Sequence, residues 1–67
     1  MERQAVLQEV SREIERLAEF HILYRMENSP LFDEQKEKVR KLIHQHNIRI
    51  QEELEPVSKN LYRRYFA

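Results

Sequence analysis

The sequence predicts an all-α protein, and three observations support this prediction. Glycine is absent from all 67 residues, which disfavours sheets joined by tight hairpin turns. Ala, Leu, Glu, Gln, Lys and Arg dominate, and these residues lose the least rotamer freedom in a helix. Apolar residues recur at alternating spacings of three and four, the period of an amphipathic helix. A chain of this length can bury only one core, so we expect a single helical domain over residues 1–67.

The first expected helix covers about residues 3–26. Its stripe consists of Leu7, Val10, Ile14, Leu17, His21 and Tyr24. This helix should end at the segment 27–30, because the residue that precedes Pro30 is pushed out of the α region. Near that end, apolar side chains surround nearly the whole helix, namely Phe20, Ile22, Leu23, Tyr24 and Met26. One neighbouring helix cannot cover them all, so at least two packing partners are expected there.

The second expected helix covers about residues 30–54. Ser29 suits the N-cap, Pro30 suits the first helical position, and Asp33 places negative charge against the helix dipole. The stripe of this helix consists of Phe32, Val39, Ile43, His46, Ile50 and Leu54. Because the connecting loop is short, the two helices should form an antiparallel hairpin.

Two architectures compete after Leu54. Pro56 would cost ~3 kcal/mol inside a straight helix, yet Val57, Leu61 and Tyr65 continue the same stripe in phase. Either the chain breaks near Pro56 and a short helix of about residues 56–66 folds back, or one long kinked helix projects toward a partner. We favour the break.

The apolar stripe is larger than a hairpin alone can cover. The expected seam of the hairpin is Leu7, Val10, Ile14, Leu17, Phe32, Val39, Ile43, Ile50 and Leu54. The expected interaction surface is Phe20, Ile22, Met26, Leu61, Tyr62, Arg63, Arg64, Tyr65 and Phe66. Small chains without cysteines often gain stability by self-association, so we expect a homodimer that resembles a four-helix bundle.

No residue pattern points to catalysis, a cofactor or a metal. His44 and His46 are two residues apart, which on a helix separates them by about 200°, whereas helical metal pairs are three or four apart. His21 and His46 fall on the apolar stripes and are expected to be structural. A chain without glycine has no phosphate-cradling loop. We expect no enzyme activity, no cofactor, no metal and no small-molecule substrate.

The net charge of the chain does not indicate a particular class of binding partner. Twelve basic residues balance twelve acidic ones, so no global field attracts nucleic acid or an acidic surface. Residues 57–67 nevertheless contain three basic residues and no acidic one. With Tyr62 and Tyr65, the cations Lys59, Arg63 and Arg64 could serve a nucleic-acid-binding accessory protein, which is the alternative function.

The sequence as a whole predicts a non-catalytic protein–protein interaction module, a small regulatory or assembly adaptor whose partners are itself and another protein. A purely structural role is a second alternative. No run approaches the ~18 apolar residues that span a membrane, and the first residues lack the pattern of a signal peptide. The expected location is therefore the cytoplasm.

Overall fold

The structure is a computed structural model that describes residues 2–26 and 28–66, and all regular structure in these ranges is helical. The elements are α1 (Arg3–Ile22), α2 (Pro30–Gln45), the π-helix η1 (Ile50–Leu54), α3 (Glu55–Ser58) and α4 (Leu61–Phe66). The all-α prediction is confirmed.

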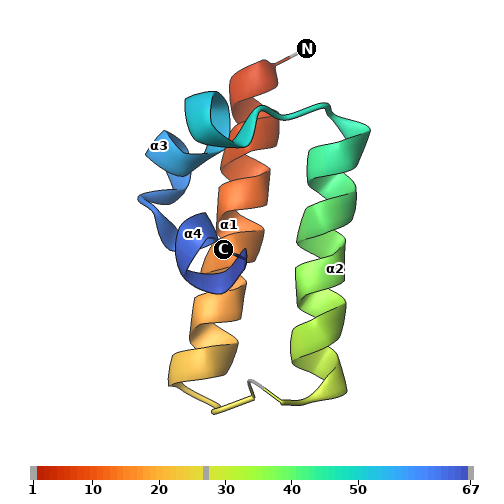
Figure 1. The fold of residues 1–67 in the computed structure, drawn as a ribbon, viewed down its shortest axis with the longest axis vertical. Helices are drawn as coiled ribbons and strands as arrows, with labels where there is room; N and C mark the ends of the chain where they lie inside the picture. The colour runs from red at the N-terminus through yellow and green to blue at the C-terminus, as the bar shows by residue number, and fades with distance from the viewer. Residues whose placement is uncertain (1, 27, 67) are drawn as a thin grey trace.

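The helices are arranged around α1. Helices α1 and α2 lie side by side and run in opposite directions, while η1, α3 and α4 pack back along α1 (Figure 1). The longest dimension of the molecule is 34 Å. A helix of the length of α1 spans about 30 Å, so every later element folds back within the length of this one helix.

Helix α1 ends at Ile22, earlier than the predicted end at about residue 26. The Leu23 N–H donates the last helical bond to the Glu19 carbonyl at 2.8 Å, and Arg25 then turns into the left-handed region with a φ of 53°. The Met26 N–H donates to the Phe20 carbonyl at 3.0 Å, which closes the turn. Glu27, which belongs to the predicted stop, lies outside the described residues.

Helix α2 begins where the sequence predicts but ends at Gln45 rather than at Leu54. At its start, the Ser29 hydroxyl accepts a hydrogen bond from the Phe32 N–H at 3.2 Å, as expected of an N-cap. At its end, Asn47 adopts a left-handed φ of 51°. The N–H groups of Asn47 and Ile48 donate to the carbonyls of His44 and Ile43, the two bonds of a Schellman motif. Asparagine tolerates this conformation better than most residues, so the motif stops the helix without a glycine.

The predicted break near Pro56 is wrong. Helical structure runs without interruption from 50 to 58, and the chain instead breaks at 46–49 and at 59–60. Pro56 lies in the first turn of α3, directly after the π turn of η1, where the Glu55 N–H donates to the Ile50 carbonyl. The first turn of a helix is where a missing N–H costs least, so the proline is accommodated.

The core lies where α1 meets the later elements. Its buried apolar side chains are Val10, Ile14, Leu17, Phe32, Val39, Ile48 and Leu54. Three predicted seam residues, Leu7, Ile43 and Ile50, are only partly buried and pack against this core. Ile48, absent from the predicted seam, is 7% exposed, because the turn at Asn47 directs the chain back over α1.

A buried polar pair joins α1 to α2. The Gln35 side-chain amide donates to the Glu13 carboxylate at 2.6 Å and to the Glu13 backbone carbonyl at 3.0 Å. Lys38 also lies 3.6 Å from the same carboxylate. Apolar contacts alone would allow α1 and α2 to shift along each other. The hydrogen bonds between Gln35 and Glu13 are directional and can form in only one alignment of the two helices, so they fix the register between α1 and α2.

At the opposite end from the loop between α1 and α2, Arg3 ties three elements together. Its guanidinium donates to the carbonyls of His46 (2.6 Å) and Asn47 (3.1 Å), just after the end of α2. It also donates to the Glu53 carboxylate of η1 at 2.6 Å. The hydrogen bond from Arg3, helped by the Arg49 backbone and both guanidinium charges, holds the pKa of Glu53 below its ordinary value of 4.5 despite partial desolvation.

Candidate functional site

Four large apolar side chains are exposed at one end of the molecule. Their exposed fractions are 61% for Ile22, 66% for Leu23, 63% for Tyr24 and 53% for Leu31. Ile22 ends α1 and Leu31 lies in the first turn of α2, and these two helix ends meet at the same end of the fold (Figure 1). We call these four residues the apolar tip.

The local backbone explains why the apolar tip is exposed. After Ile22 the chain leaves the helix, so Leu23 and Tyr24 no longer follow the stripe that faces the core. The Tyr24 ring lies 6.4 Å from the ring of Phe20, which is half-buried and packs against the core. This ring pair anchors the tip to the core on one side and leaves most of the Tyr24 surface exposed to solvent.

The residues of the predicted interaction surface come from two segments of the chain. Phe20, Ile22 and Met26 lie at or beside the apolar tip. The remaining six belong to α4, and its four apolar members pack against the core of the same chain, namely Leu61, Tyr62, Tyr65 and Phe66. The C-terminal segment thus covers part of the stripe that sequence reasoning left uncovered.

The aromatic residues of α4 make specific contacts with α1 and α2. The Tyr65 hydroxyl lies 3.2 Å from His21 Nδ1, and its ring meets the Phe32 ring edge-on at 6.2 Å between centroids. Tyr62 and Phe66 stack at 4.6 Å. The Lys36 ammonium lies 5.6 Å from the centroid of the Phe66 ring, within the range of a cation–π interaction. These contacts hold α4 against both long helices.

The two arginines of the predicted surface differ in their surroundings. Arg63 forms a bidentate interaction with the Glu55 carboxylate, with donor–acceptor distances of 2.7 and 3.3 Å. Arg64 is exposed on the same helix. Only part of the positive charge of the C-terminal segment is therefore available to an external anion.

The three histidines do not converge. His21 contacts Tyr65, His44 is exposed on the last turn of α2, and the backbone carbonyl of His46 accepts the Arg3 hydrogen bond. Across residues 2–26 and 28–66, no group of three or more histidine, cysteine, aspartate or glutamate side chains is placed to hold a metal ion.

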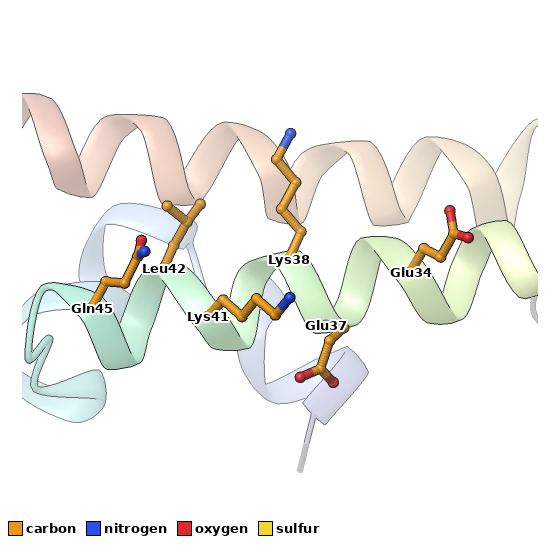
Figure 2. A pocket seen from close by; sticks show the side chains of 6 residues that line it. All are labelled: Glu34, Glu37, Lys38, Lys41, Leu42 and Gln45. Carbon is orange, nitrogen blue, oxygen red and sulfur yellow. The ribbon is translucent and has the colours of Figure 1, made fainter.

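A surface hollow with a volume of about 430 Å³ lies on α2. Figure 2 shows that all six lining side chains come from this one helix, and they are Glu34, Glu37, Lys38, Lys41, Leu42 and Gln45. The lining carries both carboxylates and ammonium groups, as on a solvated helix face. The hollow brings together no residues from different elements, so we regard the apolar tip as the stronger candidate site.

Sequence reasoning missed Leu31 as a surface residue, although it placed Leu23 and Tyr24 in the stretch that one helix cannot cover. One sequence signal indicates that Leu31 is exposed. It lies between Pro30, which starts the helix, and Phe32, which belongs to the apolar stripe. Neighbouring residues on a helix are about 100° apart, so the stripe that contains Phe32 directs Leu31 away from its centre.

Comparisons of the chain with protein-family models, with curated proteins and with solved structures give no match. Within the described residues, none of the helices combines the length and the hydropathy needed to cross a membrane.

Proposed function

We propose that this chain is a non-catalytic protein–protein interaction module, a small regulatory or assembly adaptor that docks a protein partner through its apolar tip. The observation that carries the proposal is the exposure of more than half of each of Ile22, Leu23, Tyr24 and Leu31 at one end of the fold. Isolated exposed apolar residues are common, but a group of large ones at one end of a small protein is typical of an interaction site.

Self-association is part of the same proposal. A homodimer that resembles a four-helix bundle would add apolar contacts to a chain whose single core is small. We also keep the cytoplasm as the proposed location, in line with the expectation from sequence.

The docking proposal is tested by adding charge to the apolar tip. In the double variant Leu23→Glu/Tyr24→Glu, two carboxylates would have to be desolvated on binding, which is unfavourable in an apolar interface. Immobilised protein should capture its partner from a lysate of the source cells, and this variant should capture at least about tenfold less. Capture by the wild-type chain should change little between low and high salt, because the contact is apolar.

A matched control adds the same charge elsewhere. Gln4→Glu/Gln8→Glu introduces two carboxylates at exposed positions of α1, toward its other end. This control should capture as much partner as the wild type. Equal capture by the tip variant and the control would refute docking at the tip, and a wild-type chain that captures nothing would favour a purely structural role.

The nucleic-acid alternative depends on residues that are largely engaged within the chain. Arg63 is paired with Glu55, and Tyr65 contacts His21 and Phe32. Exposed Lys59 and Arg64 alone would release few counterions from a nucleic acid. These contacts favour the interaction module over the alternative. Capture that falls steeply with salt, and that the tip variant retains, would reverse this preference.

A further inference from the structure

The turn between α3 and α4 is short and conformationally unfavourable. It consists of Lys59 and Asn60, whose φ angles are 56° and 69°. Both values lie in the left-handed region, where a Cβ atom crowds the backbone and which lysine in particular rarely adopts. Both side chains are exposed, so no burial of these side chains compensates for the conformation. A short connection under strain is the kind that favours exchange of the following segment between copies.

The sequence on both sides of this turn has the pattern of one helix. Val57, Leu61 and Tyr65 are spaced four residues apart, so they would share one face of a straight helix over residues 55–66. Neither glycine nor proline occurs between 57 and 66. Straightening would convert both left-handed residues to helical ones and would add helical backbone hydrogen bonds across the turn.

One ion pair holds the bent form and would be lost on straightening. Arg63 donates to the Glu55 carboxylate at 2.7 Å across the turn. In a straight helix these two residues would be separated by about 12 Å along the axis. The Arg63 side chain is 63% exposed and the Glu55 side chain 12% exposed, so water reaches the arginine side of this pair. Breaking it therefore costs less than breaking a fully buried pair. The bent form thus depends on one partly exposed ion pair that holds a strained turn.

The aromatic side chains of α4 pack against α1 and α2 of the same chain. Tyr65 contacts His21 and Phe32, and Phe66 contacts Lys36. No residue of α4 is fully buried by these contacts. Straightening would withdraw both rings from their own α1 and α2 and would expose Phe32. A second copy that has also straightened presents the same rings and the same receiving surface.

We propose that residues 59–60 form a hinge through which two copies of this chain exchange α4. In the exchanged dimer, residues 55–66 form one helix in each copy, and its Tyr65 and Phe66 contact His21, Phe32 and Lys36 of the other copy. The contacts of Tyr65 and Phe66 with α1 and α2 are retained across the dimer, whereas the Arg63–Glu55 pair is lost and the hinge is relieved. The two-fold arrangement is closed because each copy both gives and receives α4. This inference rests on the homodimer in the proposed function and identifies the segment that forms it.

The hinge is tested with two substitutions at Asn60. Asn60→Ala favours the straight helix, because alanine disfavours a left-handed backbone and has the highest helix propensity. Asn60→Gly favours the bent form for the opposite reasons. Helix propensity alone separates the two residues by about fivefold per hinge, so with two hinges the dimer dissociation constants should differ by about 25-fold or more. Sedimentation equilibrium over a wide concentration range measures both constants, and the Ala variant should be the tighter dimer.

A matched pair shows whether the effect belongs to the hinge. Gln8→Ala and Gln8→Gly make the same comparison at an exposed position inside α1. These two variants should have dissociation constants that agree within a factor of about two, since no hinge is involved. A difference as large as that at Asn60 would overturn the proposal.

Disulfide trapping tests which segment crosses between copies. The chain has no cysteine, so one chain carrying Lys36→Cys can be mixed with another carrying Phe66→Cys and oxidised after equilibration. Exchange places these positions together across the dimer, and a covalent heterodimer should accumulate. A mixture of Gln8→Cys with Phe66→Cys should not form one, because Gln8 lies toward the start of α1 and Tyr65 of α4 contacts His21 toward its end.

The outcomes separate this inference from the function on which it rests. Equal masses for both Asn60 variants at every concentration, or a dimer without the heterodisulfide, would overturn the exchange. If the mass nevertheless indicates a dimer, the homodimer stands and forms by another surface. If both Asn60 variants stay monomeric, the exchange and the homodimer fail together, while partner docking at the apolar tip is decided by the capture experiment.

Discussion

Arg3 shows how much of this small fold depends on a single side chain. Its guanidinium binds two backbone carbonyls after the end of α2 and the Glu53 carboxylate of η1. Helix ends leave carbonyl groups without intrahelical partners, and a cationic side chain is well suited to satisfy them. No local sequence pattern signals this contact, because Arg3 lies more than forty residues from its partners in the chain.

The Arg3–Glu53 contact predicts a specific dependence of stability on pH. The folded-state pKa of Glu53 lies below 4.5, so its contribution to stability is present above the unfolded pKa and is lost as the pH falls through the lowered value. The variant Glu53→Gln should have a lower urea midpoint than the wild type at neutral pH. The difference should shrink steadily as the pH falls below 4.5.

The neighbouring exposed Glu52 provides the control for this prediction. Glu52→Gln removes the same charge one residue away and should leave the urea midpoint nearly unchanged at every pH. The ionised Glu53 carboxylate would not have the assigned role if the urea midpoints of the wild type and Glu53→Gln differed by the same amount from neutral pH down to about pH 2.5.

At the scale of the helices, the starts of α1 and α2 were predictable and their ends were not. Ser29 and Pro30 are local signals, and α2 begins at Pro30 as expected. The ends of α1, α2 and α3 depend on left-handed residues, namely Arg25, Asn47 and Lys59. Glycine is the usual signal for such a conformation, and this chain has none. Without a glycine, the apolar stripe continues past Gln45 in the sequence, and Pro56 is the first residue after it that predicts a break.

Asn47 provides the prediction at this scale. Its left-handed backbone completes the Schellman motif, while its side chain is exposed. Asn47→Gly should stabilise the fold by up to about 1 kcal/mol, because glycine adopts this conformation freely. Asn47→Ala should destabilise it by about 1 kcal/mol, because alanine has a Cβ without the local hydrogen bonding of asparagine. Urea unfolding measures both free energies, and the same order for Gln8→Gly and Gln8→Ala would contradict this explanation.

At the scale of the whole molecule, the sequence predicted the helical class and most of the core, but not how the C-terminal third is placed. Six of the nine expected seam residues are buried: Val10, Ile14, Leu17, Phe32, Val39 and Leu54. Their periodicity is local, so it is visible in sequence. The return of η1, α3 and α4 along α1 depends on two turns that contain an asparagine, Asn47 and Asn60, but no glycine. For that reason the surface left exposed, the apolar tip, could be only partly anticipated.

The distinction between the core and the apolar tip leads to a prediction with a matched pair of leucines. Leu54 is 0% exposed in η1, whereas Leu31 is 53% exposed in the tip. Leu54→Ala should cost about 2–5 kcal/mol through lost burial and the cavity left behind. A single core of this size seldom supplies more than about 3–5 kcal/mol, so this variant should lose much of its helical circular dichroism at room temperature.

Leu31→Ala removes the same atoms from the exposed tip and should change the free energy of unfolding by no more than about 0.5 kcal/mol. It should instead reduce partner capture, because the tip side chains serve docking rather than folding. Equal losses of stability in the two variants would mean that Leu31 is part of the core and that the apolar tip is not a free surface. A stable Leu31→Ala chain that captures less partner would separate the two roles of apolar residues in this molecule.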